Sequence, residues 1–276
     1  MVGVRTAHRS REVDTETRQT LAGTSGFAMN IGHCVAIPSF SKSIDKLIGM
    51  TLSGALDAFR LEAECLSRAA AGLSEEEWRL PTRCEPWTVR ELLGHVRVVI
   101  AWLPGMLTAA EPAKAEVSAV DYYRPDDRFD VPTNTARIGV AQDYAAGLGS
   151  GAALVEDFTA TWQLVDRQCR AEREDRVVRT RHGDAMLLSQ FLLTRVVEIA
   201  VHGLDIADAL GRPPWLTRQA GDVVMELQLG PDWRSAMREL GWDRLTFLRK
   251  ATGRQRLESA DAARVERLGM RWLTLA

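Results

Sequence analysis

The stretch from Phe191 to Gly211, FLLTRVVEIAVHGLDIADALG, constrains the fold of this chain most strongly. Between Phe191 and Leu210, 13 of 20 residues are apolar, so a helix here has too little polar surface to lie on the outside of the protein. The polar residues follow one another at spacings of three, four and three positions, which places them in one file along the helix: Arg195, Glu198, His202 and Asp205. The sequence therefore predicts a buried helix over about 185–210, with Gly211 at its C-terminal cap.

Three further long helices are predicted from the spacing of apolar residues. One covers Leu52–Leu73, and another covers Ala152–Arg173. Between them, Thr88 and Glu91 have the T-x-x-E spacing of a capping box, which opens a helix expected to run to about Leu103, before Pro104 stops it. Strand signals are scarce, so we expect an all-α core of four main helices.

The remaining segments are shorter or less regular. Residues 105–150 form a poorly periodic connection, expected to carry function or short helices. Residues 177–183, VVRTRHG, could be a short strand or an extended arm. Shorter helices are expected near 217–228, 232–240, 243–252 and 258–268. Residues 1–45 are polar and lack sustained periodicity, which predicts a flexible tail.

Composition excludes several classes of partner. With 35 basic and 37 acidic residues the formal charge is -2, so no strong field would draw nucleic acid or an anionic membrane. No apolar run reaches the roughly 18 residues of a membrane span, and the N-terminal region lacks the layout of a secretory signal. The four cysteines are widely separated, which favours a reducing cytoplasm without a disulfide framework: Cys34, Cys65, Cys84 and Cys169.

The polar file suggests a metal site. Glu198 and His202 are one helical turn apart, so a carboxylate oxygen and an imidazole nitrogen can converge on one point. An amphipathic helix with a narrow solvent-exposed face would show the same residues. In that case Arg195 and Glu198 would form a surface pair worth about half a kcal/mol or less.

A histidine in the second predicted helix favours the metal interpretation. His95 lies in the apolar run LLGHVRVVIAWL, where a lone histidine is more often a packed core residue than a ligand. Facing helices of a bundle, however, direct their side chains into one core, so His95 could join Glu198 and His202. Three protein ligands are typical of a catalytic zinc, and a divalent cation would offset the cost of burying the carboxylate.

Three segments resemble the mycothiol-dependent maleylpyruvate isomerase family. TRCEPWTVRELLGHV is similar to one signature of that family, and RVVEIAVHGLDIADALGRP to the other. FLRKATGRQRLE is similar to its C-terminal Thr-Gly-Arg segment, and the resemblance covers residues from about 52 to the end. It implies a DinB-like four-helix bundle, which we place over residues 46–211, and the short predicted helices beyond it form a small C-terminal helical region over 212–276. It also implies one divalent metal, usually zinc, whose three ligands fall on His95, Glu198 and His202.

The resemblance further implies an enzyme that uses the small-molecule thiol mycothiol. A metal-bound thiol has a lowered pKa, so its thiolate can add to a small electrophile and then either leave, giving cis–trans isomerisation, or stay, giving S-transfer. Two alternatives stay open: a metal-dependent hydrolase on the same bundle, and a non-catalytic metal-binding or ligand-sensing bundle.

Other polar residues have less specific signals. Asp205 could orient an imidazole, act as a base or lie on the helix surface. Arg195 and Arg254 could each receive a carboxylate of the thiol or of the substrate. Cys84 could approach the metal but is interpreted as a small loop residue beside Trp87, itself expected to be a core anchor. In the connection, Tyr122 and Tyr123 could line a pocket or pack a loop. His182, in the segment VVRTRHG, is expected in a surface turn.

Overall fold

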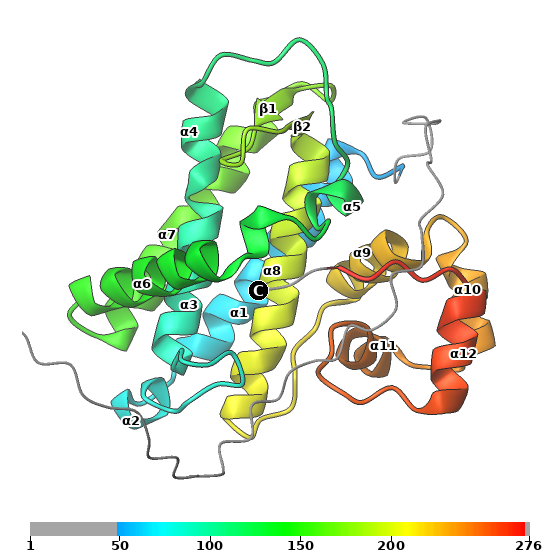
Figure 1. The fold of residues 1–276 in the computed structure, drawn as a ribbon. Coiled ribbons are helices and arrows are strands. Elements are labelled where there is room, and N and C mark those ends of the chain that lie inside the picture. The colour runs from blue at the N-terminus through cyan, green and yellow to red at the C-terminus, as the bar shows by residue number, and fades with distance from the viewer. Residues whose placement is uncertain (1–48, 274–276) are drawn as a thin grey trace, which may run out of the picture. The chain divides into compact units, whose positions relative to one another are not determined.

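A computed structural model of the chain describes residues 49–273, which are predominantly helical (Figure 1). The flexible tail predicted over residues 1–45 lies outside the described part. No helix among the described residues combines the length and the apolar character needed to cross a membrane.

Four long helices form the predicted bundle: α1 (Leu52–Ala70), α3 (Val89–Ile100), α7 (Gly151–Arg170) and α8 (Leu188–Ala209). Helix α1 packs against α7 and α8, and α3 packs against the same two helices, so that all four share one core (Figure 1). Nearly every residue of α8 is buried, as its apolar composition predicted. The all-α fold class is therefore confirmed.

Local capping signals set where the elements around α3 begin. The short helix α2 (Glu75–Trp78) starts at a capping box of Ser74 and Glu77. The predicted box before α3 is also present, because the Thr88 hydroxyl accepts from the Glu91 backbone N–H and the Glu91 carboxylate accepts from that of Thr88. These bonds fix the start of α3, and with it the direction in which His95 points.

The C-terminal end of α3 differs from the prediction. It ends at Ile100, and a separate helix, α4 (Trp102–Thr108), follows after a break at Ala101. Pro104 does not stop the chain there, because it lies in the first turn of α4, where a backbone N–H has no helical partner to lose.

The connection after α4 holds a long helix that the sequence did not reveal. It contains α5 (Ala119–Tyr122), a 3-10 turn η2 (Asp127–Phe129) and the 17-residue helix α6 (Val131–Gly147). Only Ala141 and Ala145 of α6 are buried, so no stripe of large apolar residues marks it. Helix α6 approaches α3 closely at Gly94, where an added Cβ would lie 3.2 Å from the Ala141 carbonyl oxygen.

A small hairpin precedes α8. Strand β1 (Val177–Arg179) pairs antiparallel with β2 (Ala185–Leu187). Of the two possibilities for residues 177–183, a short strand or an extended arm, the strand is therefore confirmed. Residues 185–187 of β2 were predicted as the first turn of the long helix. They are instead extended, because their backbone bonds to β1, and α8 begins at Leu188.

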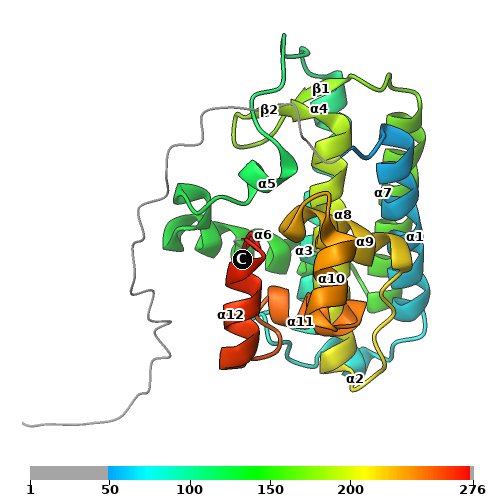
Figure 2. The ribbon, with the colours of Figure 1, turned by 90° about the vertical axis from the view of Figure 1, so that its right-hand side faces the viewer.

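The C-terminal region has the four predicted short helices: α9 (Arg218–Leu229), α10 (Trp233–Leu240), α11 (Arg244–Ala251) and α12 (Ser259–Arg267). Helix α9 packs against α1 and α8 of the bundle, and α11 packs against α9 (Figure 2). The buried Glu62 carboxylate of α1 accepts hydrogen bonds from the backbone N–H and the hydroxyl of Thr217, the N-cap of α9. This contact fixes the start of α9 on the bundle.

Candidate metal centre

Side chains of α3 and α8 converge inside the bundle. The Glu198 Oε2 atom lies 3.4 Å from Nε2 of His95 and 3.4 Å from Nε2 of His202. Ligand atoms of these three residues all lie within 4.8 Å of one another. Two ligand atoms bonded at about 2.0–2.1 Å to a tetrahedral zinc are about 3.3–3.4 Å apart, so both nitrogen–oxygen distances fit one cation.

The elements around the three side chains explain why they meet. Glu198 and His202 are one turn apart on the buried helix α8, and α3 packs against that helix at His95. Trp87, just before α3, stacks on the His95 ring with ring centroids 4.7 Å apart. The expected core anchor is buried, and it also holds one of the three side chains in place.

The charges in this cluster are strongly coupled. Burial would raise the pKa of Glu198, but hydrogen bonds from His202 and His95, together with the Arg195 charge, hold that pKa well below its usual range. Burial lowers the pKa of His95 to about 4, against the opposing hydrogen bond to Glu198. Glu198 is therefore a carboxylate and His95 a neutral imidazole at neutral pH, the protonation states in which both groups bind metals.

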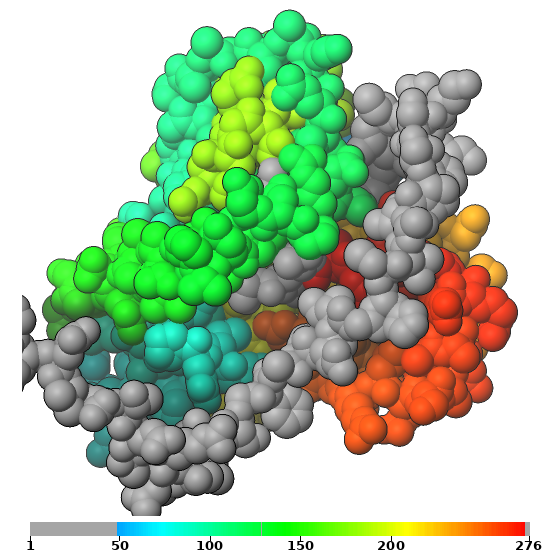
Figure 3. Space-filling model, viewed as in Figure 1, coloured from blue at the N-terminus to red at the C-terminus, as the bar shows by residue number. Residues whose placement is uncertain are grey.

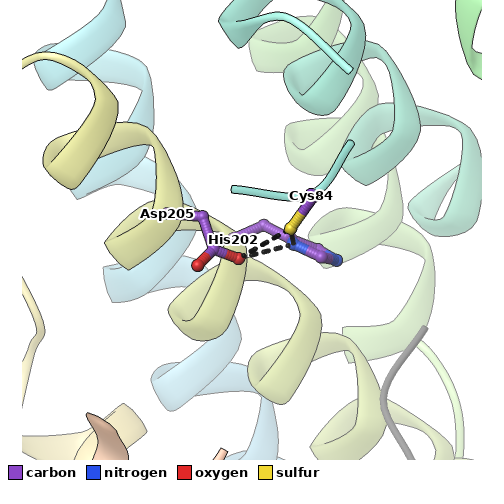
Figure 4. Close-up of side chains that lie close together, drawn as sticks. All are labelled: Cys84, His202 and Asp205. Carbon is purple, nitrogen blue, oxygen red and sulfur yellow. Dashed lines mark hydrogen bonds and ion pairs between the residues drawn. The ribbon is translucent and has the colours of Figure 1, made fainter. Parts of the chain in front are cut away.

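The other side of the His202 ring faces a second set of polar groups (Figure 4). Its Nδ1 atom lies 3.2 Å from Asp205 Oδ2 and 4.0 Å from the Cys84 sulfur. The Cys84 thiol also donates to Asp205 Oδ2 at 3.2 Å. Burial would lower the pKa of His202, but the hydrogen bonds to Asp205, Cys84 and Glu198 raise it well above its ordinary value.

Cys84 thus lies closer to the site than its interpretation as a loop residue implied. Cys84, His202 and Asp205 form a second group whose ligand atoms lie within 4.8 Å of one another. The Asp205 carboxylate already accepts two bonds from the Arg254 guanidinium, at 3.0 Å from Nε and 2.7 Å from Nη2. A cation there would compete with this guanidinium, which favours the group of His95, Glu198 and His202 as the metal site.

Arg254 comes from the loop after α11, the segment that contains Thr-Gly-Arg. Its side chain is nearly buried against Asp205, and its backbone carbonyl accepts a hydrogen bond from Arg83 at 3.0 Å. Burial would raise the pKa of Asp205, but bonds from His202 and Arg254 outweigh that effect and hold it well below its usual range. Arg254 was expected to receive a carboxylate of the thiol or of the substrate. In this structure it binds the carboxylate of Asp205 instead.

Arg195 is not on the protein surface, so the alternative of a surface pair with Glu198 is wrong. It is 1% exposed, because aromatic rings surround its guanidinium at 4.7 Å for Phe191 and 5.6 Å for Trp102. One of its nitrogens donates to the Val99 carbonyl at 3.2 Å, and another lies 3.9 Å from Glu198 Oε1.

The aromatic residues of the connection pack the protein interior. The Tyr123 hydroxyl donates to the Thr194 carbonyl at 3.0 Å, and Tyr122 packs edge-on against Phe191. His182 lies in a turn, as expected, but it is half-buried, with its ring 5.8 Å from that of Tyr122.

Sequence reasoning missed a cavity beside His95. It is lined by His95, Trp102 and two arginines, Arg137 of α6 and Arg181 of the hairpin turn, together with small apolar residues. Since α6 itself was not predicted, no sequence pattern could have brought Arg137 to this position.

Comparisons with known proteins relate much of this chain to a described family. Residues 59–207, more than half of the 276, match the family described as mycothiol maleylpyruvate isomerase N-terminal domain. Two uncharacterised Mycobacterium tuberculosis proteins, MT0041 of strain CDC 1551 / Oshkosh and Rv0036c of strain ATCC 25618 / H37Rv, are each 28% identical over 157 residues. That alignment covers 55% of this chain and 54% of each relative, so the chain spans about half the length of the curated relatives it matches.

One solved structure is also similar, that of a histidine-to-alanine mutant of mycothiol-dependent maleylpyruvate isomerase. It is 17% identical and has a TM-score of 0.41, with 75% of this chain and 73% of that chain covered. The family match includes His95, Glu198, His202 and Asp205. The chain belongs to the mycothiol maleylpyruvate isomerase N-terminal domain family.

Proposed function

We propose that the chain is a divalent-metal-dependent enzyme that uses mycothiol, as cofactor or co-substrate, to add a thiol to a small electrophile. The observation that carries this proposal is the convergence of His95, Glu198 and His202 on one point inside the bundle. Membership of the family supports mycothiol as the thiol. The reaction is either a cis–trans isomerisation, as the name of the family suggests, or an S-transfer.

The residues present fit a divalent cation, with zinc as the first candidate. Two imidazoles and one carboxylate are a donor set of catalytic zinc sites, and three protein ligands leave room for a further one. When bound, such a cation lowers the pKa of a coordinated thiol, so that the thiolate nucleophile exists at neutral pH. Cys65, Cys84 and Cys169 are free thiols, which supports a reducing, cytoplasmic compartment for this chemistry.

The surrounding residues prepare the ligands for this role. Because Asp205 accepts a hydrogen bond from Nδ1–H of His202, the Nε2 atom, which faces Glu198, is the nitrogen that would bind a cation on losing its proton. Arg254 holds both oxygens of Asp205 and so fixes that orientation. We therefore assign Asp205 a positioning role, in place of the acid–base role that its spacing alone allowed.

Arg195 acts on the opposite side of the site. Its buried positive charge, 3.9 Å from Glu198 Oε1, stabilises the carboxylate form of Glu198. The aromatic rings around it exclude water from that side of the site. In this proposal Arg195 therefore keeps Glu198 charged, so that the carboxylate remains a ligand.

The test combines metal analysis with product detection. Purified protein loaded with zinc is incubated with mycothiol and a panel of small electrophiles, and products are identified by mass spectrometry. The proposal expects product only when both zinc and mycothiol are present, and its loss in Glu198→Gln but not in the surface control Glu239→Gln. Turnover with water alone would instead identify a hydrolase. One bound metal without turnover on any electrophile would identify a ligand-binding bundle.

A further inference from the structure

The rings of His95 and His202 are held in place by different means. The ring of His202 is oriented by Asp205, which accepts a hydrogen bond from its Nδ1 atom. Among the described residues, the only hydrogen-bond partner of the His95 ring is Glu198, on the Nε2 side. No carboxylate or carbonyl of these residues fixes the His95 ring from its Nδ1 side, so its orientation depends on packing against the faces of the ring.

The indole of Trp87 covers one face of His95. The two ring centroids are 4.7 Å apart with 23° between the ring planes, so the imidazole loses this contact when it turns about its Cβ–Cγ bond. Trp87 is itself buried, and its Nε1 atom donates to the Ile138 carbonyl at 3.4 Å. That carbonyl belongs to α6, a helix that provides none of the three proposed metal ligands.

Helix α6 also contacts α3 at the residue before His95. A Cβ added at Gly94 would lie 3.2 Å from the Ala141 carbonyl oxygen and 3.3 Å from the Ala145 Cβ, so the two backbones approach closely there. The opposite face of α6 is exposed, with Val140 52% accessible, and Figure 3 shows the helix on the surface of the molecule. Because α6 buries little apolar surface, its position depends largely on polar contacts.

A cluster of three polar side chains, Tyr144, Asp157 and Arg97, joins α6 to the bundle. The Tyr144 hydroxyl of α6 donates to the Asp157 carboxylate of α7. The same carboxylate accepts from Arg97 of α3, at 2.5 Å from Nε and 3.2 Å from Nη2. The Arg97 guanidinium also lies over the Tyr144 ring, 4.5 Å from its centroid. One carboxylate therefore connects three helices, and it fixes α6 beside the segment that carries Trp87 and His95.

We propose that Trp87 is a positioning residue for His95, and that α6, held by Tyr144 and Asp157, keeps Trp87 in place. This inference rests on the proposed function, because it takes His95 as a metal ligand. The α6 carbonyl fixes one edge of the indole, and the face of the indole holds the imidazole with Nε2 directed toward Glu198. A ligand fixed in this way loses less freedom when it binds a cation. The geometry of the metal site thus depends on a helix that contributes no ligand to it.

Cobalt-substituted and zinc-loaded protein test the positioning of His95 without turnover. The visible absorption of cobalt reports the geometry of the bound ion, and competition with a chromophoric chelator gives the zinc affinity. Trp87→Ala should weaken zinc binding about tenfold or more and change the cobalt spectrum. Trp87→Phe should recover part of both, because a phenyl ring can still stack on His95 but has no N–H for α6. The matched control is Trp162→Ala, since this indole is also buried but donates to Ser67 of α1. It should keep the zinc affinity and the cobalt spectrum of the wild type.

Tyr144→Phe tests the contribution of α6. The substitution keeps the ring beneath Arg97 and removes only the hydroxyl that bonds to Asp157. It should weaken zinc binding about threefold, the effect of losing one hydrogen bond. Thr159→Val is its control, because it removes a hydroxyl bond between α7 and Ser67 and leaves α6 untouched.

Three outcomes would overturn the inference. Wild-type zinc affinity and cobalt spectrum in Trp87→Ala, or losses no larger than in Trp162→Ala, would contradict the positioning role of Trp87. Equal affinities in Tyr144→Phe and Thr159→Val would contradict the role of α6. Thermal melts identify the folded variants, and if Trp87→Ala does not fold, Trp87→Phe and Tyr144→Phe decide. A wild type that binds both ions but turns over no electrophile contradicts the proposed enzyme and not the positioning of His95, whereas a wild type that binds neither ion contradicts both.

Discussion

His202 turns the Nδ1 atom of its ring to Asp205, 3.2 Å from the carboxylate oxygen Oδ2. The opposite nitrogen of the same ring faces Glu198. The Asp205 carboxylate therefore keeps a proton on Nδ1, and Nε2 is the nitrogen that can bind a metal once its own proton is lost.

Asp205→Asn should weaken zinc binding while leaving the fold intact. The amide keeps the shape of the side chain but loses the charge that orients His202, an effect that typically costs about 10–100-fold in metal affinity. Competition with a chromophoric chelator measures the change. The matched control is Asp208→Asn, one turn further along α8. Its carboxylate pairs with Arg249 and is not part of the group of His95, Glu198 and His202. Equal affinities in all three proteins would contradict the positioning role.

Cys84→Ala should keep the metal. The proposed cation lies on the Nε2 side of His202, whereas the Cys84 sulfur lies on the Nδ1 side, 4.0 Å from that atom. Elemental analysis of the purified variant should therefore give the zinc content of the wild type. If the metal is lost with this thiol, the ion belongs to the group of Cys84, His202 and Asp205 instead.

Gly94→Val should destabilise the packing of α6 on α3. An added Cβ would meet the Ala141 carbonyl oxygen at 3.2 Å and the Ala145 Cβ at 3.3 Å, so a branched side chain must push the helices apart. Overpacking of this kind costs about 1–3 kcal/mol, which denaturant melts can resolve. Gly139→Val on α6 is the control, because nothing lies within 4 Å of an added Cβ there. A loss of stability no larger than in the control would mean that the two helices are not in this close contact.

Glu62→Gln should change how stability depends on pH. Burial raises the pKa of Glu62 above 4.5, although its hydrogen bonds with Thr217 oppose this. A carboxyl whose pKa is higher in the folded state stabilises the fold while protonated, and that contribution is lost as pH rises through the folded pKa. The free energy of unfolding of the wild type should therefore fall relative to the variant as pH increases from 4 toward neutrality. Denaturant melts of both metal-free proteins across this range test the sign, and a difference that changes in the opposite direction contradicts it.

Much of the fold could be predicted from the sequence because its main signals are local. Apolar spacing located the four bundle helices, and the Thr88–Glu91 box fixed the start of α3. Helix α6 could not be found in this way, because it buries only Ala141 and Ala145 and shows no apolar stripe.

The candidate site was predictable only where its residues share one helix or one signature. The one-turn spacing of Glu198 and His202 selected them as a pair, and the structure places His95 beside them. The roles of Cys84 and Arg254 depend on loops that meet α8 in three dimensions, and no spacing encodes that meeting. Arg195 fitted a narrow polar face equally well, and only the aromatic rings packed around it show that it is buried.

The central claim is that His95, Glu198 and His202 together hold one divalent cation. Metal content per chain, measured by mass spectrometry on wild type and on the single alanine variants of these residues, tests it most directly. The account predicts about one zinc in the wild type and almost none in folded His202→Ala, because two remaining ligands hold zinc poorly. His182→Ala changes a histidine that is not one of these three residues, so this variant should keep the zinc content of the wild type. Full metal occupancy in His202→Ala, or a wild type that binds none from zinc-containing buffer, would contradict the account.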